Sequence, residues 1–87
     1  MAFDPNKLEL LAGGGAVLSL WGYASAADAA AAIDAAGYFD DAAGVLKVGD
    51  WILVNAADGR GIAVVASNAG GSVDVADILA VGAADTR

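Results

Sequence analysis

The sequence predicts a small α+β domain: an antiparallel sheet or open barrel of about four strands, one alanine-rich helix and an N-terminal arm. Three observations support this prediction. The second half of the chain alternates apolar runs with turns at Asp58-Gly59 and Gly70-Gly71, which is typical of antiparallel strands. Ser25 followed by Asp28 forms a capping box that opens a run of alanines ending at Gly37. The length of 87 residues fits a single domain.

Residues 1–15 are expected to form an arm with a glycine hinge, followed by a globular domain over residues 16–82 and a tail over residues 83–87. Asp4 followed by Pro5 is the pattern of a short helical start. The three consecutive glycines at 13–15 cannot hold a regular element together. Two interpretations remain open: a flexible tail, or an arm that docks apolar side chains on a neighbouring subunit. Those side chains are Phe3, Leu8 and Leu11.

The first strand is expected over residues 16–24, where apolar side chains alternate with a period of two. Gly22 marks a bulge or a close approach of another backbone. The alternation places Val17, Ser19, Trp21 and Tyr23 on one face, and Leu18 and Leu20 on the other.

The helix is expected over about residues 26–36, with Ser25 as its cap and Asp28 in its first turn. Gly37 is expected to adopt a left-handed conformation and end it. The next two residues, Tyr38 and Phe39, are expected to fold back over that end of the helix as large apolar caps.

Three further strands are expected over residues 51–56, 62–67 and 73–77, with residues 78–81 continuing the last one. With Asp58 and Gly59 as the hairpin loop, Trp51 pairs with Ala66. Both faces of this hairpin are apolar, whereas a half-exposed antiparallel sheet carries polar residues on one face. Because one short helix covers one face only, the other is expected to meet a curled sheet, a closed barrel or another subunit. One face carries Trp51, Leu53, Asn55, Ile62, Val64 and Ala66, and the other carries Ile52, Val54, Ala63 and Val65.

The charge of the chain excludes several partners. There are 11 acidic and 4 basic residues, a net charge of −7, and the scattered bases offer no patch for nucleic acid. Anionic membranes are disfavoured for the same reason, and no apolar run reaches the roughly 18–20 residues that cross a bilayer. The N-terminus lacks the pattern of a signal peptide. We therefore expect a protein made in the cytoplasm that stays there, or leaves in a particle or by lysis.

The residue types also restrict the chemistry. Because the chain has neither Cys nor His, disulfides, thiolate metal sites and Ser-His-Asp or Cys-His nucleophiles are excluded. Asp40 and Asp41 are adjacent carboxylates that could hold a hard cation, but calcium loops space their ligands differently, so a solvated turn is expected. The glycine runs lack the spacing of phosphate-binding loops. A carboxylate pair of the glycosidase type stays open by residue type, but a chain of 87 residues has little volume for a substrate cleft beside its core. We therefore expect no catalytic residue, no cofactor and no metal.

Self-association is the stabilising device that remains open to this chain. Small domains commonly use disulfides, metals or oligomerisation, and the apolar fraction of 59% is high. Four aromatic residues could form a platform for a ligand such as a sugar, but a role in the core or an interface is favoured. They are Trp21, Tyr23, Tyr38 and Trp51. The candidate interface residues are Phe3, Leu8, Leu11, Trp21, Tyr23, Tyr38, Phe39 and Trp51.

Five short phrases between about Leu20 and Val75 are similar to a known group of proteins. They are LWGY, SAADAAAAIDAAG, GYFDDAAGVL, VGDWILV and, after a glycine turn, AVVASNAGG. In these phrases the chain resembles short proteins of tailed bacteriophages and prophages that look like capsid decoration (cement) or head-fibre-base proteins. Residues 1–15 lie outside the resemblance.

The resemblance implies a non-enzymatic viral structural protein on the outer capsid surface of the virion. Its partners would be the major capsid protein and further copies of itself, with a homotrimer expected from the decoration analogy. Its role would be to bridge neighbouring capsid subunits and to resist the pressure of packaged DNA. The alternatives are a head-fibre, tail or baseplate module that presents a receptor-binding surface, and a free-standing module that binds a small ligand.

Overall fold

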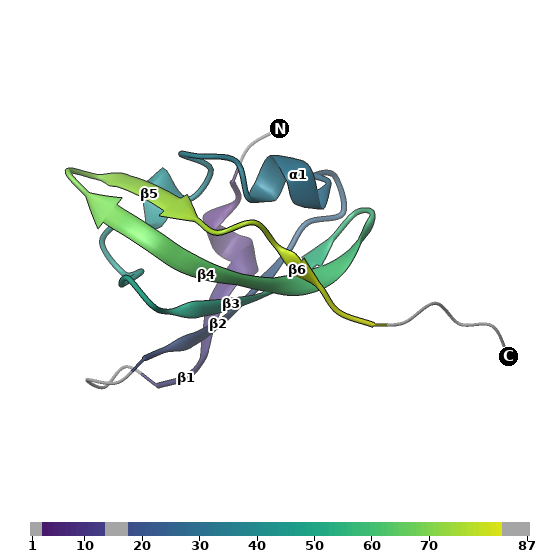
Figure 1. The fold of residues 1–87 in the computed structure, drawn as a ribbon, viewed down its shortest axis with the longest axis horizontal. Coiled ribbons are helices and arrows are strands. Elements are labelled where there is room, and N and C mark those ends of the chain that lie inside the picture. The colour runs from purple at the N-terminus through teal and green to yellow at the C-terminus, as the bar shows by residue number, and fades with distance from the viewer. Residues whose placement is uncertain (1–2, 14–17, 83–87) are drawn as a thin grey trace, which may run out of the picture.

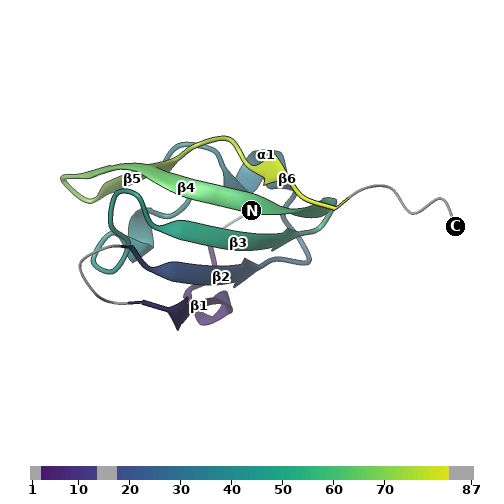
Figure 2. The ribbon, with the colours of Figure 1, turned by 60° about the horizontal axis from the view of Figure 1, so that its bottom comes forward.

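A computed structural model describes residues 3–13 and 18–82 of the chain, and over these residues the fold is one open, mixed sheet of six strands. The strands lie in the order β1-β2-β3-β4-β5, and β6 pairs with β4 off this path. Figures 1 and 2 show the sheet from two directions. The strands are β1 (Leu8–Ala12), β2 (Leu20–Ala24), β3 (Trp51–Ala56), β4 (Gly59–Ala69), β5 (Ser72–Val75) and β6 (Leu79–Ala80).

We expected an antiparallel sheet or barrel of about four strands. The sheet instead has six strands, and not all of them are antiparallel. β2 and β3 are parallel, whereas the other neighbouring pairs are antiparallel. A parallel pair needs a crossover connection, and here residues 25–50 supply it. Apolar alternation reveals which residues share a face but carries no information on strand direction, which is why the parallel pair could not be predicted.

The crossover carries the helix, which is much shorter than expected. The structure has α1 over Ala30–Ile33 only, and a 3₁₀ turn η2 over Asp40–Ala42. The capping box closes a turn, since Ser25 Oγ accepts a hydrogen bond from the backbone N–H of Asp28 at 3.0 Å. The cap of α1 comes from elsewhere, because Asp58 Oδ1 accepts from the N–H of Ala30 at 2.9 Å.

Gly37 has the positive φ that was predicted for it, 87°. However, α1 ends before it, and turns occupy most of the residues from 34 to 39. The backbone N–H of Gly37 donates to the carbonyl oxygen of Val73 in β5 at 3.1 Å. This glycine therefore fastens the crossover to the sheet edge rather than closing a long helix.

The β3–β4 hairpin confirms the predicted faces but not the predicted register. Trp51 pairs with Val64 instead of Ala66, and the two-residue loop is formed by Ala57 and Asp58. Gly59 is the first residue of β4 and pairs with Ala56. A shift of two residues leaves every side chain on its original face, so the assignment of faces was unaffected by the error.

The last strands also differ from the expectation. β5 ends at Val75, and residues 78–81 do not continue it but contain β6, which returns to the beginning of β4. β4 is 11 residues long and pairs with β6 near its start and with β5 near its end, with a register shift between Val65 and Ser67. Figure 1 shows β4 and β5 curling up beyond this shift.

The hydrophobic core lies between the sheet and the crossover, which Figure 1 shows on one side of the sheet. The sheet contributes the inward side chains of four strands, and the crossover contributes four side chains that cover them. The former are Tyr23, Ile52, Val54, Ala56, Ala63, Val65, Val73 and Val75, and the latter are Ile33, Phe39, Ala42 and Leu46.

The N-terminal segment is part of the sheet rather than a separate arm over its described residues. A 3₁₀ turn η1 over Pro5–Lys7 begins with Asp4 as its cap and leads into β1. β1 pairs with β2 from Leu8 to Ala12, with a register shift after Leu10. The local sequence gave little sign of this strand, because β1 is short and is followed directly by glycines. Residues 14–17, with two of the hinge glycines, the expected tail at 83–87 and residues 1–2 lie outside the described residues.

Candidate interaction surface

One face of the sheet is apolar and uncovered. Along β3, Ile52 and Val54 are 0% and 3% exposed, whereas the alternating residues Trp51 and Leu53 are 43% and 39% exposed. The side chains that share the outward direction on neighbouring strands follow from the strand register. We call this surface the open face. It comprises Leu11, Leu20, Gly22, Trp51, Leu53, Ile62, Val64, Leu79 and Val81.

The open face is ordered in rows that cross the strands. Leu20, Trp51 and Val64 form one row, and Gly22, Leu53, Ile62 and Leu79 form the next. Leu11 lies over Gly22, where a Cβ would be 3.1 Å from Leu11 Cδ1. The missing side chain of Gly22 thus makes room for a leucine from the edge strand, which keeps the face continuous across β2.

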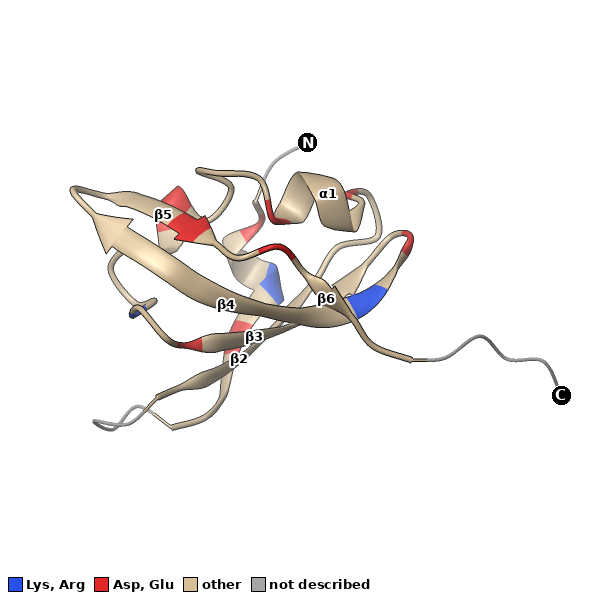
Figure 3. Cartoon of the chain, viewed as in Figure 1, with Lys and Arg blue, Asp and Glu red and all other residues tan. Residues whose placement is uncertain are grey.

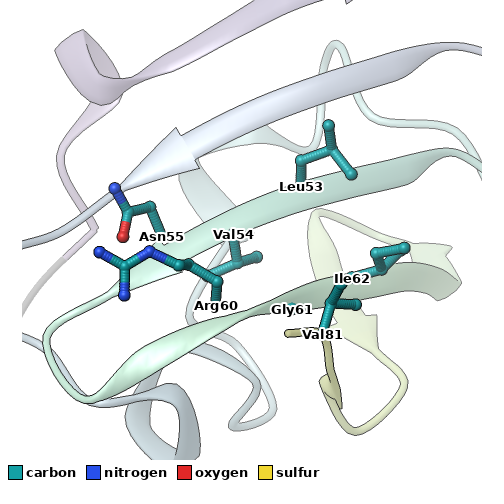
Figure 4. Close-up of a pocket in the computed structure, with 7 residues that line it drawn as sticks. All are labelled: Leu53, Val54, Asn55, Arg60, Gly61, Ile62 and Val81. Atoms are coloured by element: carbon teal, nitrogen blue, oxygen red, sulfur yellow. The ribbon is translucent and has the colours of Figure 1, made fainter. Parts of the chain in front are cut away.

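A shallow pocket lies at one end of the open face, with a volume of about 320 Å³. Figure 4 shows it between the ends of β3 and β4 and the chain beyond β6. Leu53, Ile62 and Val81 give it an apolar lining, and Arg60 and Asn55 lie side by side at one end. The pocket therefore combines a hydrophobic surface with one cationic group.

Charge is unevenly distributed between the two sides of the sheet. Several carboxylates lie on the crossover side (Figure 3), where they accept hydrogen bonds from backbone N–H groups. Asp40 Oδ1 accepts from Val73 at 2.7 Å, and Asp34 Oδ2 accepts from Ile78 at 2.9 Å. On the open side, the charged residues of the described strands are Glu9 in β1, Arg60 in β4 and, beyond the curl of β4, Asp74 in β5.

Asp50 lies beside the open face, just before β3, and its side chain bonds to groups of neighbouring segments. Its carboxylate is 1% exposed and accepts three hydrogen bonds: from the backbone N–H of Ser19 to Oδ1, and from the backbone N–H of Lys47 and Trp21 Nε1 to Oδ2. Burial raises the pKa of this carboxyl, but these hydrogen bonds and the charge of Lys47 outweigh it and hold the pKa below its ordinary value. The ionised carboxylate thus joins the start of β2 to the start of β3, next to Trp51.

An aromatic cluster fills the opposite, covered side. The rings of Phe3, Tyr23, Tyr38 and Phe39 contact one another with centroid separations of 5.1 to 6.1 Å. The Tyr38 hydroxyl donates to Asp28 Oδ2 at 2.6 Å and lies 2.7 Å from the Tyr23 hydroxyl. Burial, followed by these two hydrogen bonds, raises the pKa of Tyr38 well above its usual value. Of the four residues considered as a ligand platform, Tyr23 and Tyr38 therefore belong to this cluster and Trp21 packs partly buried against the core, whereas Trp51 lies apart on the open face.

The eight candidate interface residues fall into three groups. Tyr23 and Phe39 are buried in the core, and four others pack partly buried against it, whereas Leu11 and Trp51 lie exposed on the open face. The four partly buried residues are Phe3, Leu8, Trp21 and Tyr38. Sequence reasoning did not select Leu53, Leu79 or Val81. The alternation along β3 indicated Leu53, but Leu79 and Val81 depend on how β6 returns to β4.

The expectation of a solvated turn at Asp40 and Asp41 holds for Asp41 only. Asp41 is exposed, whereas Asp40 anchors the backbone of β5 through Val73. Over residues 3–13 and 18–82, no group of three or more acidic, His or Cys side chains is placed to hold a metal ion. Over the same residues, no helix is long and apolar enough to span a membrane.

No known protein family, no curated protein and no solved structure matches this chain.

Proposed function

We propose that this protein is a non-enzymatic structural protein of a tailed-phage virion. In this proposal it decorates the outer capsid surface, binds the major capsid protein, bridges neighbouring capsid subunits and self-associates. Assembly takes place in the host cytoplasm. The observation that carries the proposal is the open face, a contiguous apolar surface on a rigid sheet of a very small chain. Contiguous apolar patches of this kind mark protein–protein contacts.

The side chains of the open face are suited to a binding role. Trp51 and Leu53 project from a central strand whose other face is anchored in the core, so their positions cost little conformational entropy to fix on binding. Burying one large apolar side chain contributes about 1.5–3 kcal/mol. A few such residues at the centre of an interface supply most of its binding energy. The acid-rich opposite side keeps a chain of net charge −7 soluble before assembly.

The location on a capsid and the trimeric state come from the resemblance of residues 20–75 to phage decoration proteins. A small sheet with an apolar face is compatible with many binding roles, and the resemblance selects among them. In a decoration protein that self-associates, linked copies contact several capsid subunits at once, so moderate affinity at each contact suffices for high occupancy.

A second candidate function is a head-fibre, tail or baseplate module that presents a receptor-binding surface. The pocket beside Arg60 and Asn55 favours it, because an apolar surface with a few polar groups at one end is suited to binding a ligand. The two functions differ in copy number, since a shell carries hundreds of decoration sites and a tail carries few fibres.

Quantitative mass spectrometry of purified particles tests the proposal. A copy number in the hundreds supports decoration, a few copies support a tail or fibre part, and absence from particles overturns both. Occupancy by variants then tests the open face. Leu53→Asp is expected to lower occupancy sharply, whereas Val45→Asp, an exposed apolar position in the crossover, is the matched control and is expected to leave it unchanged.

A further inference from the structure

We infer that the open face packs against the open face of a second copy of this chain, so that two sheets form a sandwich around a two-fold axis. The inference rests on the self-association in the proposed function but not on the capsid. A face-to-face pair is a dimer, and the inference departs here from the trimer that the resemblance suggests.

The size of the open face is the first reason. Its central strands are spaced by about 4.8 Å and its rows by about 6.7 Å, so the two apolar rows cover about 260 Å² in plan over four strands, and the row of Asn55 and Arg60 adds about 130 Å². The largest exposed apolar patch of a domain is commonly a few hundred Å² and often marks a binding site. Trp51 and Leu53 lie near the middle of this area, with Leu20 and Ile62 on the flanking strands. The pairing area is at the small end for specific interfaces, which predicts a dimer of modest affinity.

The shape of the open face is the second reason. A sheet with one face covered by a crossover and the other bare is one half of a two-layer sandwich. Two copies of one sheet have the same right-handed twist, and sheets of equal twist pack at about −30° with a separation of about 10 Å. A second copy therefore offers a surface of the same twist.

The charges on the open face are the third reason. Glu9 shares the row of Gly22 and Leu53, and Arg60 lies in the next row, beside Asn55. A two-fold axis in the plane between the sheets, passing between β2 and β3 at about 15° to the strands, gives a crossing angle of about −30° and brings β1 of one copy over β4 of the other. Glu9 then lies about one row, roughly 7 Å, along the strands from the partner copy's Arg60 and about 10 Å from it across the interface, a separation that two long side chains can span. The axis repeats this pair, so both copies have their opposite charges matched.

Pairing through the sheet edge is less suitable. The edge strand β1 has a register shift after Leu10, and an irregularity of this kind interrupts the row of hydrogen-bonding groups that an added strand needs. At the other edge, β5 and β6 divide the length of β4 between them. The open face is therefore a more regular surface for a second copy than either edge.

Sedimentation equilibrium over a range of concentrations tests the inference. The wild-type chain is expected to show a reversible dimer, and Leu53→Lys is expected to weaken it by about a hundredfold. Arg60→Glu and Glu9→Arg place like charges opposite each other, and each is expected to weaken the dimer by about tenfold. The double variant exchanges the two charges and is expected to restore most of the affinity. Asp74→Arg is the matched control, because Asp74 lies beyond the curl of β4, and it is expected neither to weaken the dimer nor to rescue Arg60→Glu.

Circular dichroism tests whether each variant is folded, and the charge variants remain informative if Leu53→Lys does not fold. A wild-type monomer at all accessible concentrations overturns the inference, as does a dimer or trimer that is insensitive to Leu53→Lys and to both charge reversals. Rescue by Asp74→Arg in place of Glu9→Arg overturns the proposed axis. If the protein dimerises but is absent from particles, the capsid proposal fails and the pairing stands. If the wild-type chain is a monomer that binds particles and a substitution of Leu53 abolishes this binding, the open face binds the shell and the pairing inference is wrong.

Discussion

Trp21 and Asp50 are joined by a hydrogen bond of 3.1 Å from the indole Nε1 to the carboxylate Oδ2. The bond connects the two parallel strands of the sheet, β2 and β3, at the end where the crossover enters β3. Asp50 is buried, which disfavours its charged form. Three N–H groups donate to the carboxylate and stabilise that form. The bond lies directly before Trp51, the first residue of β3 and part of the open face.

Removal of the Asp50 carboxylate is expected to destabilise the whole fold. Asp50→Ala removes the carboxylate that accepts from three buried or half-buried N–H groups, and a loss of about 3 kcal/mol of unfolding free energy is expected. Asp41→Ala is the control, because Asp41 is exposed, and a change within about 0.5 kcal/mol is expected there. Urea denaturation measures both. A loss for Asp50→Ala no greater than the control would show that these bonds are not formed in solution.

Stability is also expected to fall with acid in a way that depends on Asp50. Its pKa is lower in the folded chain than in the unfolded chain, so the unfolded state binds the proton more readily as the pH falls. The stabilisation is present in full above the ordinary carboxyl pKa of about 3.9 and is lost as the pH falls through the folded value. The measurement is the unfolding free energy of wild type and Asp50→Asn between pH 6 and pH 2. Their difference should shrink below about pH 4, and a constant difference over the range contradicts the assignment.

Tyr38 is expected to be needed for the burial of Asp28. Asp28 is 2% exposed, and its Oδ1 has no hydrogen-bond partner among the described residues. Tyr38→Phe removes the hydroxyl that donates to Asp28 Oδ2. A loss of about 2 kcal/mol of unfolding free energy is expected. Thermal denaturation measures the loss. Tyr23→Phe keeps the bond between Tyr38 and Asp28 and is expected to cost less.

A second substitution separates the charge effect from packing. In the Tyr38→Phe background, Asp28→Asn replaces a buried charge by a neutral amide, which costs less to leave partly unpaired. The double variant should therefore be more stable than Tyr38→Phe alone. If it is less stable, the loss in Tyr38→Phe reflects the packing of the aromatic cluster and not the carboxylate.

Gly61 is expected to control the docking of β6. A Cβ at this position would clash with Ile78 Cγ2 and lie 2.5 Å from the backbone oxygen of Leu79. Gly61→Ala should therefore displace β6 from β4. The readout is increased amide hydrogen exchange at Val81, whose N–H donates to the carbonyl oxygen of Arg60 at 3.0 Å. Gly44→Ala serves as the control, since no heavy atom lies within 4 Å of a Cβ there. Unchanged exchange in Gly61→Ala would mean that β6 is not held close to β4.

The predictable part of the fold is the part that local alternation determines. The faces of β3 and β4 were correct in spite of a register error of two residues, because a period of two is insensitive to such a shift. The alternation of Trp51 and Leu53 with Ile52 and Val54 thus indicated the open face from the sequence. The apolar character of both faces correctly pointed to a surface that the crossover does not cover.

The parts that were not predictable depend on contacts between distant residues. Asp50 accepts from Ser19, which lies 31 residues away, and no local pattern encodes such a pairing. The alanine run predicted a long helix from propensity, but Asp28 is held by Tyr38 and Asp58 caps Ala30, so tertiary contacts shorten it. Several aspartates that composition counted as surface charge are instead acceptors for backbone N–H groups.

The N-terminal segment was expected from the sequence to be an arm separate from the folded domain. If it were an arm, residues 1–12 could be removed without loss of folding. In the structure, β1 pairs with β2, and the ring of Phe3 lies 5.4 Å from those of Tyr23 and Phe39. Deletion of residues 1–12 is therefore expected to remove the edge strand and to open the aromatic cluster.

The size of the effect can be bounded and measured. Loss of the Phe3 packing alone is worth about 2 kcal/mol, and Phe3→Ala isolates this contribution because it leaves β1 in place. The deletion should exceed it and lower the melting temperature by more than about 10 °C, since 1 kcal/mol shifts a domain of this size by roughly 4–8 °C. Scanning calorimetry of wild type, Phe3→Ala and the deletion gives the order of the three. If the deletion has the melting temperature of the wild type, residues 1–12 behave as an arm that does not stabilise the fold. If it has the melting temperature of Phe3→Ala, the stability that residues 1–12 contribute comes from the Phe3 ring and not from β1.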